Sequence, residues 1–231
     1  MQLLKYRPNK ESEWKEIATI AIGNIPSGGS LPAEALTISG NCDYKFYRNN
    51  WNWFVKSFGN KIKTKDITNG YYMFQSSNEI EEIPFEINFK EGQSASIGAI
   101  FGGCYKLTKI PKINNLKVNN INAAFASCFN LRTIPDDIAD TWDFSLFNDI
   151  PQERGISGLF VDCYSLRKIP YNLISNYHIC VERDFYSSMF TRCYSLDEIV
   201  NLSVPYIASE KNSDCFTNTF DECARLKKLT F

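Results

Sequence analysis

The chain has 231 residues, of which 44% are hydrophobic and 22% charged, so it can bury a substantial core and is neither disordered nor collagen-like as a whole. Its 25 basic and 26 acidic side chains give a net charge of −1, which argues against a general electrostatic affinity for nucleic acid or for an anionic membrane. A single histidine, His178, stands against eight cysteines. Because one histidine cannot furnish a histidine-rich metal centre and histidine is the commonest general acid or base, we expect no metal, no cofactor and no catalytic residues.

The first 26 residues predict a small β arm. Two strand-like segments, residues 3–6 and 14–22, flank a polar turn at residues 8–13. Charged residues interrupt this region before an apolar run of signal-peptide length can form, so we expect neither a cleaved export signal nor membrane insertion. Because an isolated hairpin of this size is only marginally stable, we expect the arm to pair with another chain. The predicted anchoring residues are Leu3, Tyr6, Trp14, Ile17 and Ile20.

A linker and a cap are expected after the arm. Residues 27–34 are rich in glycine, serine and proline, as flexible linkers are. Residues 35–72 then predict a degenerate first repeat or an N-terminal cap, because their aromatic side chains would cover the open end of a stack of repeats. These aromatic residues are Phe46, Trp51, Trp53, Phe54 and Phe58.

From residue 73 to residue 231 one pattern, Phe-x-x-Cys-x-x-Leu-x-x-Ile-Pro, occurs six times with small departures. Its phenylalanines lie 27, 24, 35, 30 and 30 residues apart, so the unit is close to 30 residues long, and Ser77 takes the cysteine position in the first copy. Repetition of this kind is typical of stacked repeat architectures. The residues at the Phe position are Phe74, Phe101, Phe125, Phe160, Phe190 and Phe220, and the cysteines are Cys104, Cys128, Cys163, Cys193 and Cys223.

The chemistry of the pattern predicts how one unit folds. Phe and Cys three residues apart share one face of a helical turn, so both can point into the same core. The Leu-x-x-Ile-Pro part favours an extended backbone, because proline disfavours helix in the residue before it. One unit cannot bury its own apolar face, whereas six stacked units form a continuous core. We therefore predict an α+β repeat solenoid, with a short-strand parallel sheet on one side and helical turns on the other.

This pattern resembles the bacterial surface-antigen type of leucine-rich repeat, which occurs in secreted surface proteins of gut and oral bacteria and in phages that infect them. The order of arm, linker and repeat domain resembles that of fibre and appendage proteins of crAss-like tailed phages. The resemblance implies a non-enzymatic virion protein, a head fibre or tail-associated appendage, assembled in the cytoplasm of the host bacterium. Its partners would be further copies of itself, a capsid or other virion protein at the arm, and a host-surface glycan or protein. The alternative is a bacterial cell-surface adhesin or glycan-binding module.

The five repeated cysteines are interpreted as a core ladder, because equivalent residues of stacked units lie about 5 Å apart and a buried cysteine behaves as a small hydrophobe. A metal site or a disulfide framework is the weaker interpretation, since the sequence has no Cys-x-x-Cys pair. A cysteine nucleophile activated by His178 has no supporting motif. Cys42, Cys180 and Cys215 fall outside the ladder and receive no predicted role.

Two surface features remain open to two interpretations, and a third carries a single prediction. The residue pairs between the repeated Leu and Ile, from Glu81-Glu82 to Lys227-Lys228, would form either lateral salt bridges or a ligand-binding ridge. An aromatic stripe after the cysteines would either contact sugars or a protein, or cover an edge of the core. The last apolar residues would form an oligomer edge that closes a homo-dimer or homo-trimer. The stripe is Tyr105, Phe129, Tyr164 and Tyr194, and the edge is Leu226, Leu229 and Phe231.

Overall fold

A computed structural model gives the architecture of nine segments of the chain. They are residues 2–6, 15–22, 36–43, 51–146, 156–174, 179–180, 186–202, 206–207 and 216–231. The predicted polar turn, the linker, Trp14, Phe46, His178 and Cys215 lie outside the described residues.

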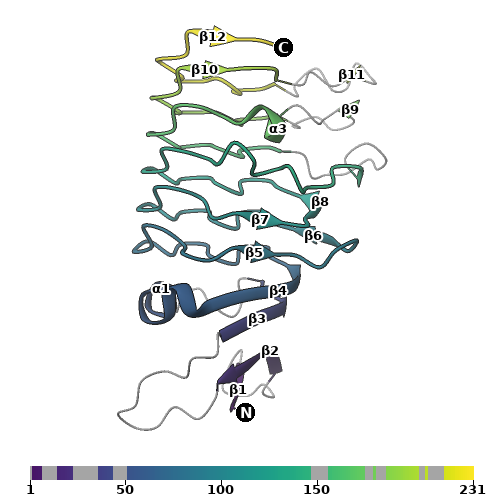
Figure 1. The fold of residues 1–231 in the computed structure, drawn as a ribbon. Helices are drawn as coiled ribbons and strands as arrows, with labels where there is room; N and C mark the ends of the chain where they lie inside the picture. Colours follow the sequence, from purple (N-terminus) through teal and green to yellow (C-terminus); the bar gives the residue numbers. More distant parts are fainter. Residues whose placement is uncertain are drawn as a thin grey trace.

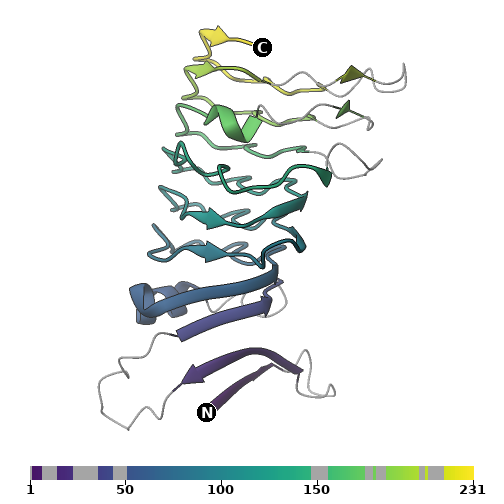
Figure 2. The ribbon, with the colours of Figure 1, turned by 45° about the vertical axis from the view of Figure 1, so that its right-hand side comes forward.

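The N-terminal arm is an antiparallel strand pair. Strand β1 (Gln2–Tyr6) pairs with β2 (Lys15–Ile22), with Gln2 opposite Ile22 and Tyr6 opposite Lys15. The predicted anchor positions Leu3 and Tyr6 therefore lie in β1, and Ile17 and Ile20 lie in β2. The pair sits at the base of the molecule, where β2 lies against β3 (Figures 1 and 2).

The rest of the chain rises as a stack of successive turns, with a parallel contact between each level and the next (Figures 1 and 2). At the base, β3 (Leu36–Asn41) pairs with β4 (Ile62–Asn69), and α1 (Trp51–Phe58) and the 3-10 helix η1 (Gly59–Lys61) connect them. The later strands are very short and also pair in parallel. They are β5 (Ile87–Asn88) with β7 (Ile113–Asn114), β6 (Ser94–Ser96) with β8 (Lys117–Asn120), β9 (Ile179–Cys180) with β11 (Tyr206–Ile207), and β10 (Glu198–Ile199) with β12 (Lys228–Leu229). A single helical turn, α3 (Tyr171–Ile174), follows the fourth copy of the repeat.

The Phe-x-x-Cys segments form consecutive tight turns and not the helical turns expected from their spacing. Around Phe101, the amides of Ile100, Gly102 and Cys104 each donate to the carbonyl three residues earlier, at 2.9–3.0 Å. The residues two before and two after each repeated phenylalanine have positive φ, between 48° and 74°. These left-handed residues turn alternate peptide groups in opposite directions, which a helix cannot do. They are Tyr72, Ser76, Ala99, Gly103, Ala123, Ser127, Gly158, Asp162, Ser188, Arg192, Asn218 and Glu222.

The alternate amides that face outwards from each turn bind the next level. Ala99, Phe101 and Gly103 donate to the carbonyls of Asn122, Ala124 and Ala126 at 2.8–2.9 Å. The same three positions donate at all five junctions between the six copies. Every amide from Ala99 to Cys104 is thereby paired, half within its own turn and half with the next one, as buried backbone requires.

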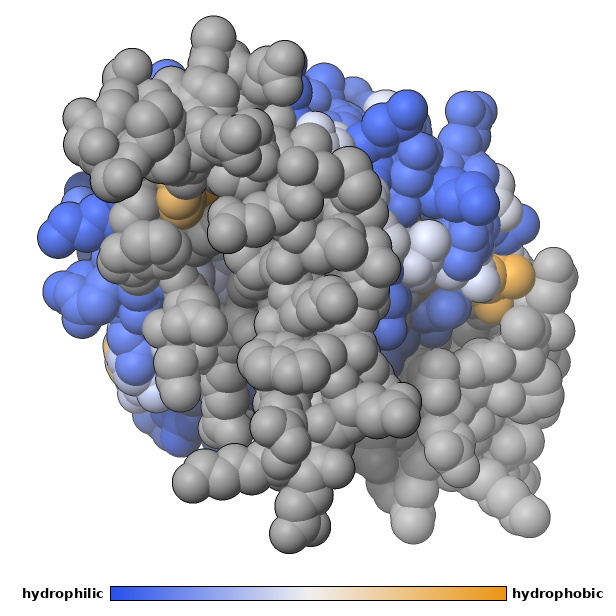
Figure 3. All heavy atoms as spheres, turned by 90° about the horizontal axis from the view of Figure 1, so that it is seen from below, coloured by the Kyte–Doolittle hydropathy of each residue, from blue (hydrophilic) through white to orange (hydrophobic). Residues whose placement is uncertain are grey.

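The phenylalanine rings form one column through the core. Ring centroids of neighbouring copies lie 5.4–5.9 Å apart and the ring planes differ by 7–15°. The first five rings are fully buried and Phe220 is half-buried. At the base, the buried ring of Trp51 lies 4.3 Å from that of Phe74, so helix α1 covers the lower end of the column, and Phe58 packs against the same core. The described side chains visible from below are mainly hydrophilic, with small apolar patches (Figure 3).

Whether this stack belongs to the leucine-rich-repeat class stays a prediction. The repeated Leu and Ile side chains are buried in the first five copies, and single bridges or two-residue strands join the levels beside them, as in Lys109 with Thr133 and Lys168 with Glu198. The pairing of β5 with β7 and of β6 with β8 lies outside the repeat pattern and was not expected.

The left-handed positions predict different responses to glycine within one turn. Ala123 has φ +53°, whereas Ala126, three residues later, is not left-handed. Ala123→Gly relieves roughly 1 kcal/mol of backbone strain, which offsets the entropic cost of glycine, whereas Ala126→Gly only adds that cost. We expect Ala123→Gly to be more stable than Ala126→Gly by about 1 kcal/mol in urea unfolding. Equal losses in both variants would contradict the assigned turn geometry.

Candidate functional site

The five repeated cysteines each donate a hydrogen bond to the backbone. In every case the thiol Sγ lies 3.1–3.2 Å from the carbonyl oxygen of the phenylalanine in the preceding copy. All five are free thiols, and all except the half-buried Cys223 are fully buried. A small side chain with a weak donor suits this position, because it fills the core and also satisfies a carbonyl.

Burial makes these thiols poor nucleophiles. Desolvation raises the pKa of Cys104 to about 12 and raises the pKa values of Cys128 and Cys163 well above the usual range. The pKa of Cys193 is raised by the same cause. A thiol with so high a pKa stays protonated at neutral pH, and the reactive form is the thiolate. The ladder position is therefore used in packing.

Three further residues complete the description of these positions: Ser77 and Cys42 near the base of the stack, and Cys180 higher up (Figure 1). Ser77, in the cysteine position of the first copy, is buried, and its hydroxyl has no hydrogen-bond partner among the described residues. The level below it contains helix α1 and lacks the Phe-x-x-Cys turn that offers a carbonyl elsewhere. Cys42 is buried beside β3, and desolvation raises its pKa to about 12. Cys180 lies in β9.

The aromatic stripe is a second ring column, at the surface. Tyr105, Phe129 and Tyr164 stack face to face, with centroids 4.6 and 4.7 Å apart and planes 3° from parallel. Tyr194 continues the column at 5.1 Å with a 31° tilt, and its hydroxyl donates to Glu222 at 3.2 Å. Both faces of Phe129 and Tyr164 are covered by their neighbours. These two rings therefore have only edges to offer a ligand, and a sugar cannot stack on their faces.

The charged pairs between Leu and Ile form lateral ion pairs at some junctions. Lys109 lies 2.5 Å from Glu82, and Lys228 lies 3.7 Å from Glu198. Arg225 approaches Asp197 at 3.4 Å. All are exposed, so each contributes at most about 1 kcal/mol to stability.

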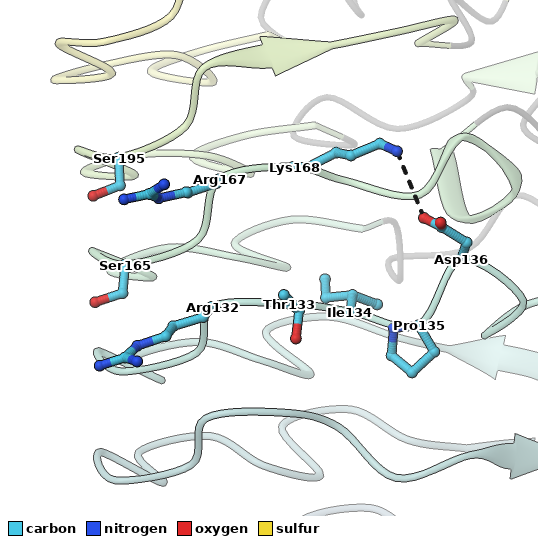
Figure 4. Close-up of a pocket in the computed structure, with 9 residues that line it drawn as sticks. All are labelled: Arg132, Thr133, Ile134, Pro135, Asp136, Ser165, Arg167, Lys168 and Ser195. Atoms are coloured by element: carbon cyan, nitrogen blue, oxygen red, sulfur yellow. Dashed lines mark ion pairs between the residues drawn. The ribbon is translucent and has the colours of Figure 1, made fainter.

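A shallow basic groove occupies the middle of the same face. It is an open hollow of about 790 Å³ in which Arg132 and Arg167, at equivalent positions of adjacent copies, extend to the same side (Figure 4). The hydroxyls of Ser165 and Ser195 lie on that side too, whereas Lys168 points away towards Asp136, at 3.8 Å (Figure 4). The sequence placed both arginines among the residue pairs between the repeated Leu and Ile, for which lateral salt bridges and a ligand-binding ridge were both open, but it did not indicate the serines. Each serine directly follows a tyrosine of the aromatic stripe, and this position in the repeat could have identified them.

One ion pair within the stack was also missed. Arg192 forms two hydrogen bonds with the half-buried carboxylate of Asp162, and Ser127 in the preceding copy lies 3.5 Å from the same carboxylate. All three stand two residues after a repeated phenylalanine, so they are stacked by the repeat itself. The pair is bidentate, which holds both side chains in place.

The predicted oligomer edge has mixed exposure. Leu226 and Leu229 are half-buried and pack against the core, whereas 69% of the Phe231 surface is exposed. Among the described residues, no group of three or more histidine, cysteine or acidic side chains is arranged to hold a metal ion. No helix in the described segments is long and apolar enough to cross a membrane.

Comparison of the chain with protein-family models, with curated proteins and with solved structures found no match.

The buried thiols predict a loss of stability in alkali. Folding raises the pKa of the Cys104 thiol from near 9 to about 12, so the folded state favours the neutral thiol. This stabilisation is fully present below pH 9, and it is lost as the pH rises from 9 towards 12. We expect the free energy of unfolding to fall steeply above pH 9. In Cys104→Ala the fall is shallower by up to about 1.4 kcal/mol per pH unit.

Urea titrations at pH 8 to 11 measure this slope. Cys223→Ala is the matched control, because Cys223 is half-buried and its slope change is smaller. Identical slopes in wild type and Cys104→Ala would show that this thiol ionises as readily in the folded chain as in the unfolded one.

Proposed function

We propose that this chain is a non-enzymatic, fibre-like appendage protein of a phage virion, head or tail-associated, which displays a leucine-rich-repeat solenoid. The proposal is supported above all by the use of the recurring residues. The repeated amides, thiols and rings bind the neighbouring levels of the stack, and the exposed faces carry the residues that differ between copies. Such a stack serves as a rigid spacer with long contact surfaces.

The arm supplies the second part of the proposal. Strands β1 and β2 pair only with each other among the described strands, and a two-stranded hairpin is marginal alone. In the proposed function a capsid or other virion protein completes this pairing, and the stack then projects from the particle. Self-association into a dimer or trimer through Leu226, Leu229 and Phe231 belongs to the same proposal.

A bacterial surface adhesin or glycan-binding module is the second candidate. The groove around Arg132 and Arg167 favours it, because arginines on a rigid face that have no ion-pair partner among the described residues are suited to a ligand.

Particle composition tests the proposal. We expect the full chain in purified particles of the phage that encodes it, detected by quantitative mass spectrometry. Leu3→Asp with Ile20→Asp should reduce the incorporated protein at least tenfold, because charge in the hairpin opposes its pairing. Lys63→Asp, at an exposed position of β4, is the control and should incorporate normally.

Circular dichroism melts must show the same stack stability in all three proteins. Normal incorporation of the doubly substituted arm would overturn the anchoring role. Absence from particles together with recovery from bacterial cell surfaces would overturn the virion assignment in favour of the adhesin.

A further inference from the structure

On the face that carries the residue pairs between the repeated Leu and Ile, some charged side chains are in ion pairs and others are not. Ion pairs join the lower levels through Glu82 and Lys109, and the upper levels through Glu198 and Lys228. Between them, the exposed side chains of Arg132 and Arg167 have no ion pair or side-chain hydrogen bond with any described residue. Asp197, at the equivalent position one copy above Arg167, pairs with Arg225 on its other side. Two like charges are thus stacked one level apart, and no acidic group of the described residues lies between them.

The surroundings of the two arginines are those of a binding groove. They lie along the open hollow together with the hydroxyls of Thr133, Ser165 and Ser195 (Figure 4). The acidic side chain in the lining, Asp136, lies at the far end, where it faces Lys168. Among the described residues, the arginine end therefore offers positive charge and hydroxyl groups.

The donor set identifies the ligand chemistry. A guanidinium presents a planar fork of N–H groups that matches a carboxylate, and two forks one level apart can bind one carboxylate from both sides. Serine and threonine hydroxyls both donate and accept, as the hydroxyls of a sugar do. The apolar residues that line the groove, Ile134 and Pro135, lie towards its Asp136 end, so the described residues at the arginine end form no apolar pocket for the side chains of a peptide (Figure 4).

We propose that this groove binds a carboxylate-bearing polysaccharide, with Arg132 and Arg167 on the carboxylate and the three hydroxyls on the sugar. This deepens the contact role proposed above and rests on it for its biological purpose. Binding by the isolated full chain is independent of where the protein is assembled, so failure of this proposal and failure of the virion assignment are distinguishable.

Calorimetry with polygalacturonate tests the proposal at low salt, where exposed charges are least screened. We expect Arg132→Gln with Arg167→Gln to weaken binding by about tenfold or more, because hydrogen bonds to a charged group are lost. The control, Lys63→Gln with Lys227→Gln, removes the same charge from exposed positions outside the groove and should bind within twofold of wild type. Arg132→Lys with Arg167→Lys keeps the charge without the fork and should bind with intermediate affinity.

Binding measurements with three comparison ligands complete the test. We expect neutral dextran not to bind, and sulfated dextran and polyglutamate to bind more weakly than polygalacturonate. Tighter binding of sulfated dextran would assign the groove to sulfate, and tighter binding of polyglutamate would assign it to an acidic protein; either result overturns the carboxylated-sugar proposal. Equal weakening by the groove variant and its control, with both folded by circular dichroism, would show that only net charge matters and would also overturn it.

Discussion

The structure depends on one backbone arrangement, the alternation of amide directions in the turns around each repeated phenylalanine. Amides at the phenylalanine and two residues to either side bind the next level, while the amides between them close their own turn. Because each junction uses the same three donors, every level sits directly above the one before it in the same register. The columns of phenylalanine rings and of thiols are consequences of that register.

The cysteine position shows how the side chains adapt to the backbone. Each phenylalanine carbonyl accepts from the cysteine amide of its own turn, and a second lone pair remains. The thiol of the next copy uses that lone pair at little cost, because sulfur is weakly polar and its desolvation is easily tolerated. A serine there needs an equally good acceptor, and at Ser77 the described residues offer none. The rise in thiol pKa follows from the same burial.

The sequence pattern predicted the columns well and the backbone poorly. Fixed spacing of Phe, Cys, Leu and Ile was sufficient to predict which side chains share a position in the stack. The left-handed residues could not be foreseen, because only Gly103 and Gly158 among the twelve are glycine and residues such as Tyr72 and Arg192 do not usually adopt that conformation. A three-residue spacing fits a helical turn and a hydrogen-bonded turn equally well, so the pattern alone could not separate them. Strands β5 to β8 were missed because segments of two to four residues carry no periodic signal.

The backbone and the core side chains, and not the charged side chains, hold the levels of the stack together. Lateral ion pairs, one of the two roles predicted for this face, join only some levels and are exposed, whereas three backbone hydrogen bonds and a ring contact join every junction from Phe74 to Phe220. Exposed ion pairs contribute too little to compete with those interactions. The residues between Leu and Ile are therefore free to vary without altering the fold. Where Arg132 and Arg167 bring like charges together, the backbone is strong enough to hold them there, and an anionic ligand is the partner that such a surface lacks.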